Sequence, residues 1–182
     1  DGSGLADYLL GTETVTSIAV DGADRKWFGT LSSGAYLLSE DGKEQLYHFN
    51  TSNSPLLSDN IVKVSINGLT GEVWFGTAEG IVSFRGDATT GKSDYSGMYV
   101  FPNPVREDFE GVVTITGLIE NSTVKITDIS GNLVWETTSS GGQATWDLRN
   151  YRSARVTSGI YLVFCSNEDG SIAEVTKMLI IR

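Results

Sequence analysis

Apolar and polar residues alternate in short runs along most of the chain, and Gly, Asn, Asp and Ser separate the runs. Alternation of this kind is typical of β-strands, because successive side chains of a strand point to opposite faces of a sheet. No segment carries the regularly spaced apolar stripe that indicates an amphipathic helix of several turns. The pattern therefore predicts an all-β protein with many short strands and tight turns.

Two short segments are almost identical, KWFGT at 26–30 and VWFGT at 73–77, and they place Trp27 and Trp74 47 residues apart. The flanking residues predict three strands in each copy, with a fourth strand at 44–50 after the first copy. A repeat of this length with four strands per unit is typical of a β-propeller blade. The sequence therefore predicts two partial propeller blades.

The residues of the repeated motif suit the packing of neighbouring blades. Trp is large enough to fill the space between two sheets, and Gly29 and Gly76 lack a Cβ atom, which permits a turn or a close approach of another backbone. Two blades cannot close a ring that typically holds about four to eight. We therefore interpret residues 1–90 as the C-terminal blades of a truncated propeller and residues 5–13 as the outer strand of a preceding blade. We expect such a fragment to self-associate through its uncovered blade faces and edges.

The two copies resemble the propeller repeats of two-component regulators. The residues that carry the resemblance are Ile18, Asp21, Trp27, Gly29, Thr30 and Gly34 in the first copy, and Trp74, Gly76, Thr77 and Gly80 in the second. The second copy has Asn67 where Asp is usual in these repeats. The resemblance covers residues 14–86 and implies a propeller there.

The pattern changes after a polar segment rich in Gly, Ser and Thr, of which residues 91–97 are interpreted as a linker. Residues 98–182 contain about seven short runs, with turn sequences such as SGN at 130–132 and NEDG at 167–170 between them. Strands at this density predict an immunoglobulin-like β-sandwich.

Several residues of this second domain have expected structural roles. Trp135 and Trp146 are expected in its core, and Cys165 is expected to be a buried small apolar residue. Pro102 and Pro104 remove two N–H donors, so their segment is expected at a sheet edge or in a turn rather than in a central strand.

Five motifs of this domain resemble the C-terminal sorting domain of the type IX secretion system, which exports proteins across the outer membrane of Bacteroidetes-type bacteria. The motifs are FPNPV, DISGNLV, WDLRN, SGIYLV and KMLIIR, in this order. The resemblance implies that sorting involves Pro102, Asn103, Pro104, Asp128, Gly131, Gly159, Tyr161 and Lys177. Of these, Gly131 and Gly159 are expected to adopt positive φ at turns. The last strand is expected to offer an edge to a partner.

The loop before the SGIYLV strand departs from the sorting-domain pattern. The family often has a Gly in this loop, where the chain has YRSARV at 151–156. Arg149, Arg152 and Arg155 follow one another at intervals of three residues in an otherwise acidic protein. They form either an anion or phosphate site or, as we favour, a solvated loop with salt bridges.

Composition narrows the possible functions. The net charge of −10 argues against nonspecific nucleic-acid binding, which requires Lys and Arg to displace phosphate counterions. One His and one Cys do not supply the ligands of a zinc site. No nucleophile-elbow, calcium-loop or phosphate-binding glycine motif is found. We therefore predict no catalytic residues, no cofactor and no metal in this chain.

The order of a regulator-type propeller and a sorting domain resembles the PorZ-type component of the type IX secretion apparatus. This resemblance implies an exported protein of the outer membrane and cell surface that docks to the secretion machinery and its sortase and binds anionic lipopolysaccharide, without catalysis. Three alternatives stay open. The chain could belong to secreted cargo with a cleavable sorting domain and a glycan- or protein-binding propeller, to the periplasmic sensor of a hybrid two-component regulator, or to an enzyme whose catalytic domain lies upstream of residue 1.

Overall fold

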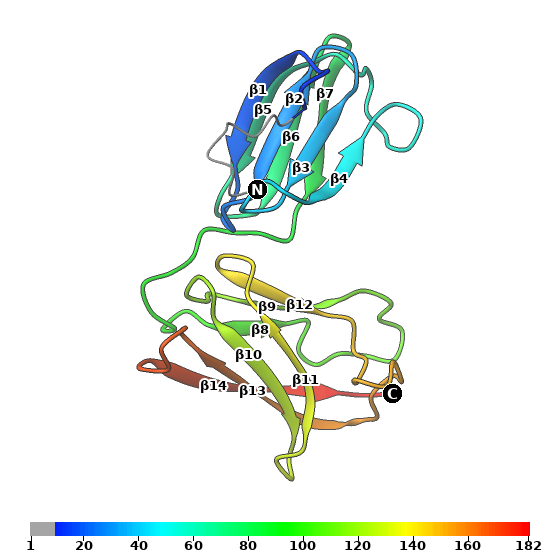
Figure 1. Cartoon of the computed structure of the whole chain (residues 1–182). Helices are drawn as coiled ribbons and strands as arrows, with labels where there is room; N and C mark the ends of the chain where they lie inside the picture. Colours follow the sequence, from blue (N-terminus) through cyan, green and yellow to red (C-terminus); the bar gives the residue numbers. More distant parts are fainter. Residues whose placement is uncertain (1–9) are drawn as a thin grey trace. The chain divides into compact units, whose positions relative to one another are not determined.

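The computed structural model describes residues 10–182. Its internal contacts divide the chain into two compact units, with the boundary in the sequence between Gly86 and Asp87. Every regular element in the described residues is a β-strand, and the strand pairs within the sheets are antiparallel (Figure 1). The prediction of an all-β protein is therefore confirmed. No helix that could span a membrane occurs in this part of the chain.

The first unit contains two antiparallel sheets whose strands follow one another in chain order. The four-stranded sheet consists of β1 (Val15–Val20), β2 (Lys26–Thr30), β3 (Ala35–Leu38) and β4 (Gln45–Phe49). The three-stranded sheet consists of β5 (Ile61–Asn67), β6 (Glu72–Thr77) and β7 (Gly80–Arg85). Each copy of the repeated motif thus forms the second strand of its own sheet, as expected for two partial propeller blades.

Trp27 fills the space between these two sheets. Its side chain is 1% exposed, and its ring centroid lies 5.4 Å from that of Phe75 and 6.0 Å from that of Phe84. Phe49 of β4 closes the aromatic cluster at 5.9 Å. Aromatic side chains bury large apolar areas, so this cluster contributes much of the stability of the unit.

The two blades approach closely where the first copy of the motif has its glycine. A Cβ atom on Gly29 would lie 2.6 Å from Cγ2 of Ile61, a distance that packed atoms do not tolerate. The Val64 amide donates a hydrogen bond to Ser17 Oγ at 3.1 Å and links β5 to β1. At Gly76 the nearest atom would lie 3.7 Å away. The close approach is therefore a property of the first copy only.

The outer strand expected at residues 5–13 is not found in the part of it that is described. Residues 5–9 lie outside the described residues, and residues 10–13 form a turn in which the Glu13 amide donates to the Leu10 carbonyl at 2.8 Å. Leu10 packs against a small cluster on the face of the first sheet opposite Trp27. The members of this cluster are Phe28, Tyr36 and Leu38.

The second unit is the predicted sandwich of seven strands in two antiparallel sheets. One sheet has the order β11-β10-β13-β14, with β10 (Thr123–Asp128), β11 (Leu133–Thr138), β13 (Gly159–Ser166) and β14 (Ala173–Ile180). The other has the order β12-β9-β8, with β8 (Tyr99–Phe101), β9 (Val113–Thr116) and β12 (Gln143–Trp146). Both predicted turn sequences form hairpins, SGN between β10 and β11 and NEDG between β13 and β14.

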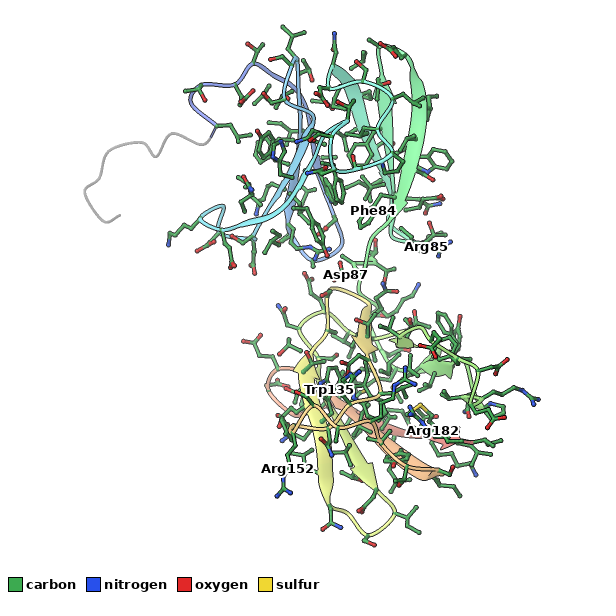
Figure 2. The ribbon with its side chains drawn as sticks, turned by 90° about the vertical axis from the view of Figure 1, so that its right-hand side faces the viewer. Phe84, Arg85, Asp87, Trp135, Arg152 and Arg182 are labelled. Atoms are coloured by element: carbon green, nitrogen blue, oxygen red, sulfur yellow. The ribbon has the colours of Figure 1, made fainter. Side chains whose placement is uncertain are left out.

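The core of the sandwich forms around Trp146, which is fully buried. Its indole Nε1 donates to the Arg149 carbonyl at 2.7 Å, and its ring packs edge-on against Tyr161. Trp135 is half-buried and lies against Trp146 with 6.1 Å between ring centroids (labelled in Figure 2). Cys165 is buried in the same core. The expected core residues are therefore found there, with Trp135 at its margin.

Residues 87–97, which include the linker expected at residues 91–97, belong to the second unit. Lys92 donates its amide to the Leu118 carbonyl at 2.8 Å, and Thr89 forms a β-bridge with Gly141. Tyr95 is 4% exposed, and its hydroxyl lies 2.7 Å from Ser122 Oγ. The polar composition of residues 87–97 conceals these contacts, because the buried residues Ala88, Thr89 and Tyr95 form no periodic apolar pattern.

Candidate functional site

The FPNPV segment binds the free edge of β14. The side chain of Asn103 donates from Nδ2 to the Lys177 carbonyl and accepts at Oδ1 from the Leu179 amide, both at 3.0 Å. Val105 continues the contact, since its amide donates to the Leu179 carbonyl and its carbonyl accepts from the Ile181 amide, both at 2.8 Å. Asn103 thus makes the pair of hydrogen bonds that a neighbouring strand would make.

Pro102 and Pro104 flank this asparagine on either side and lie outside any strand, as the sequence predicts. Neither has an N–H group, so neither can pair with a second strand on its other side. The segment is therefore a cover for one end of the β14 edge and cannot itself extend the sheet.

Asp128 and Gly131 form the turn between β10 and β11. The Asp128 carboxylate accepts from the Asn132 side chain at 2.8 Å and from the backbone amides of Ser130 and Asn132 at 2.8 and 3.0 Å. These hydrogen bonds, that of the Asn132 side chain foremost, lower the pKa of the Asp128 carboxyl. Gly131 has φ of 84°, so the expected positive φ is confirmed there.

Gly159 and Tyr161 belong to the central strand β13. Gly159 is its first residue and pairs with Ile180, and its φ is not positive, so the expectation of a turn conformation at this glycine is wrong. The Tyr161 side chain points into the core, and its hydroxyl donates to the Thr157 carbonyl at 2.9 Å.

The register of the sheet brings most of these motif residues to one end of it. Asp128 of β10 lies opposite Tyr161 of β13, and Lys177 of β14 lies opposite Leu162 of β13. Their side chains do not share a pocket, because Tyr161 faces the core while Lys177 is exposed on the outer face. The motif residues therefore lie towards one end of the sheet and do not line a common pocket.

The three arginines lie in one loop, but two of them already have acidic partners. Arg149 Nε lies 3.7 Å from an oxygen of Asp147, and Arg155 Nη2 lies 3.4 Å from an oxygen of Glu110. Arg149 also donates from Nη1 to the Ser153 carbonyl at 2.7 Å. The side chain of Arg152 projects from the sandwich surface (Figure 2). Of the three, Arg152 is the one most available to an anion, and the anion site stays a prediction.

The single His and the single Cys have structural surroundings. The ring of His48 stacks on Tyr36 at 4.0 Å, and His48 Nε2 lies 2.7 Å from the Ser33 carbonyl oxygen. Burial raises the pKa of the Cys165 thiol to about 12, so it is not a nucleophile at neutral pH. Within residues 10–182, no group of three or more His, Cys, Asp or Glu residues is placed to hold a metal ion.

Sequence reasoning missed one surface feature, the outer face of the β13–β14 pair. This face carries a hollow of about 340 Å³ lined by side chains of β10, β13 and β14. Its lining includes Thr123, Lys125, Phe164, Ser166 and Val175. The signal was available in the unbroken apolar run IYLVFC at 160–165, which lacks the alternation of a strand with one solvated face.

Comparison with known proteins places this geometry in context. Residues 99–182 match the family model of the secretion system C-terminal sorting domain. No curated protein matches the chain. Among solved structures, the chain is similar over 100% of its length to 24% of PorZ from Porphyromonas gingivalis, with 37% identity and a TM-score of 0.66. That protein is described as an essential bacterial surface component of the type-IX secretion system.

Two further solved structures show weaker similarity. Dimeric latent PorU from Porphyromonas gingivalis matches 60% of the chain with 12% of its own length, at 24% identity and a TM-score of 0.37. The extracellular domain of the hybrid two-component system BT3049 from B. thetaiotaomicron matches 98% of the chain with 40% of its own length, at 13% identity and a TM-score of 0.38.

Proposed function

We propose that this chain, whose residues 99–182 match the family model of the secretion system C-terminal sorting domain, is part of a non-catalytic component of the type IX secretion attachment complex. The protein is exported and lies at the cell surface. In the proposed function it docks to the secretion machinery and its sortase, and it binds anionic lipopolysaccharide. The chain spans 24% of the length of PorZ, so the remaining parts of such a protein would lie outside it.

The observation that carries this proposal is the extent of the similarity to PorZ. The match, at 37% identity overall, covers both units of this chain, the two blades as well as the sandwich. A sorting domain alone is shared by any protein that uses the same export route. The blades that precede it are the part that favours a component of the apparatus over one of its passengers.

The geometry supports a role in docking rather than in chemistry. Each unit consists of paired strands around a hydrophobic core of its own. The carboxylates that lie in turns, such as Asp128 and Asp169, accept hydrogen bonds from their own turns. We therefore assign to the two units the role of surfaces that hold other molecules in place, with no bond made or broken on them.

Secreted cargo is the second candidate, and the presence of the sorting domain itself favours it. The two candidates differ in the fate of residues 98–182, because cargo loses its sorting domain at the sortase and an apparatus component keeps it. One epitope inserted beside the exposed Lys43 in the turn between β3 and β4 and another in the exposed loop Arg106–Asp108 would report on the two units separately.

The experiment is to express the doubly labelled parent protein in its own bacterium and to follow both epitopes on the cell surface. The proposal predicts that both epitopes stay on one polypeptide at the surface. Loss of the second epitope from the surface form, with the first retained, would show that the protein is cargo.

Lipopolysaccharide binding has its own test, using purified chain and anionic lipopolysaccharide as the probe. We expect measurable binding by the wild type and weaker binding by Arg152→Glu, because this guanidinium is the most available of the three in its loop. Arg106→Glu is the matched control, an equal charge change on an exposed Arg of the same unit. Equal binding by all three proteins would remove the arginine loop from the proposed function.

A further inference from the structure

Strand β13 is apolar on both of its faces, although only one face lies in the sandwich core. Tyr161, Val163 and Cys165 are buried, whereas Ile160 and Phe164 on the other face are 48% and 42% exposed. A strand with one solvated face normally alternates apolar and polar residues, and apolar residues on both faces are typical of strands that are covered on both sides. The apolar residues on both faces of β13 therefore indicate that another molecule covers its outer face in the functional state of the protein.

The apolar surface continues onto β14 through consecutive cross-strand pairs. On the outer face Ile160 lies opposite Leu179, and Phe164 lies opposite Val175. Leu179 and Val175 are 40% and 49% exposed. We call these four residues together with Leu162 the outer patch. Contiguous exposed apolar surface of this kind marks sites that bind other molecules.

The outer patch ends at a strand edge that is only half covered. β14 is the last strand of its sheet, and Asn103 and Val105 bind its backbone between Lys177 and Ile181. In the described residues no strand pairs with the same edge between Ala173 and Val175, where the Val175 amide donates only to the side chain of the preceding Glu174. Backbone groups on an open edge are available to an added strand.

The charge on the outer patch restricts what covers it. Lys177 lies opposite Leu162 in the middle of the patch, and its ammonium group makes no hydrogen bond or ion pair with the described residues. A cation surrounded by apolar side chains favours a partner that brings a carboxylate to the same place. The hollow beside Phe164 and Val175 provides space for one larger apolar side chain.

From these observations together we propose that the β14 edge and the outer patch form a docking site for an extended segment of another protein, which adds to the sheet as a further strand beside Ala173–Val175. The segment carries an acidic residue that meets Lys177 and alternate apolar residues that extend the patch. A polypeptide is favoured over a lipid because only a polypeptide can pair with the open backbone of the edge. The proposal does not depend on lipopolysaccharide binding by the arginine loop.

The test uses the whole 182-residue chain and a phage-displayed library of random linear peptides. We expect selection on the wild type to enrich peptides that alternate apolar residues and contain Asp or Glu. The most enriched peptide, made synthetically, should bind Lys177→Glu at least about tenfold more weakly than the wild type, since one ion pair in an apolar setting carries that much free energy. Lys92→Glu, an equal charge change at an exposed position of the same unit, should bind as the wild type does.

A second measurement separates strand addition from simple apolar contact. Two N-methylated forms of the same peptide each carry methyl groups on one of the two alternate sets of amides. The form whose methyl groups face the edge cannot pair with it and should lose binding, whereas the other form should keep it. Unchanged binding of both N-methylated peptides, no enrichment by the wild type, or equal affinity for Lys177→Glu would each overturn the proposal. So would binding of anionic phospholipid vesicles that depends on Lys177 in the absence of any peptide binding, because the occupant would then be a lipid surface.

Discussion

The indole ring of Trp27 lies edge-on to the phenyl ring of Phe75, with 5.4 Å between their centroids and 64° between their planes. The two residues occupy neighbouring positions of the same repeated motif, Trp27 in the first copy and Phe75 in the second. Trp27 points from β2 towards the second blade, and Phe75 points from β6 back towards the first. Phe28 and Trp74 lie on the opposite faces of their sheets. The Trp of the motif therefore packs against the blade that follows in the chain, and the Phe packs against the blade that precedes.

Replacement of Trp27 by Ala should cost about 3–5 kcal/mol of unfolding free energy, because it opens a cavity in a buried aromatic cluster. Trp27→Phe should cost much less, since it keeps ring contacts and removes an indole N–H that is buried without a partner in the described residues. Urea denaturation followed by far-UV circular dichroism measures both. Trp74→Ala is the matched control: this side chain is 43% exposed, and its loss should cost less than half as much. Equal losses for the two tryptophans would contradict the packing described here.

The glycines of the motif should also differ. Gly29→Ala should destabilise the chain by about 1–3 kcal/mol, because the new methyl group meets Ile61 at 2.6 Å and β5 must move. Gly76→Ala should be close to neutral, since the nearest atom lies at 3.7 Å. Thermal unfolding of the two variants beside the wild type tests this, and a larger shift for Gly76→Ala would refute it.

Asn103→Ala should loosen the end of β14 without unfolding the sandwich. Each of the two hydrogen bonds that Asn103 makes contributes about 0.5–1.5 kcal/mol. We expect faster hydrogen exchange at the Leu179 amide, which loses its acceptor. Exchange at the Ile181 amide is the internal reference, because its acceptor is the Val105 carbonyl. An unchanged exchange rate at Leu179 would mean that Asn103 does not protect the edge.

Acid should weaken the turns of the protein before it affects the cores. Hydrogen bonds in the turns lower the pKa of Asp94, Asp128 and Asp169, and Ser39 foremost lowers that of Asp41 from 3.8 to about 2. A lowered pKa in the folded state stabilises it at pH values above the unfolded pKa, and this contribution is lost as pH falls through the folded pKa. Denaturation midpoints should therefore decline from about pH 4 towards pH 2.

The variant Asn132→Ala tests how much of the loss of stability in acid comes from the turn between β10 and β11. Asn132→Ala removes the hydrogen bond that most lowers the pKa of Asp128, so the pKa of Asp128 should rise and the decline with pH should become shallower. NMR titration of the Asp128 carboxyl measures the pKa directly. An unchanged pKa in the variant would show that the backbone amides of the turn are sufficient.

Cys165 should be inert in the folded protein. Its thiol is buried and its pKa is raised to about 12, so thiolate is scarce at pH 8 and reagents cannot reach it. Alkylation by iodoacetamide followed by mass spectrometry should show no modification under native conditions and full modification in urea. Rapid native alkylation would indicate that the sandwich opens readily.

Sequence reasoning succeeded where structure follows from neighbouring residues. The alternation of strands, the SGN turn with its positive φ at Gly131 and the core position of Trp146 all depend on short segments whose residues specify their own geometry. The repeat added one piece of long-range information, because equal motifs 47 residues apart imply equal places in adjacent sheets.

It failed where structure depends on residues distant in the chain. The FPNPV motif does not predict that the Asn103 side chain binds the backbone of Lys177 and Leu179, which lie 74 and 76 residues later in the chain. The docking of Tyr95 on the sandwich is hidden for the same reason, since its partner Ser122 lies 27 residues away in an unrelated turn. The anion site at Arg152 stays a prediction, because composition and spacing do not determine which guanidinium groups find acidic partners.

The motif gives the two faces of each blade different aromatic side chains, Trp on one face and Phe on the other. A blade offers an indole on its leading side and a phenylalanine on its trailing side, so a duplicated blade inserted in the same orientation would find a fitting neighbour on both sides. A blade inserted in reverse would set indole against indole and phenyl against phenyl. Growth of such an array by tandem duplication thus needs no new interface, and Trp74, which is 43% exposed, lies on the leading side of the second blade.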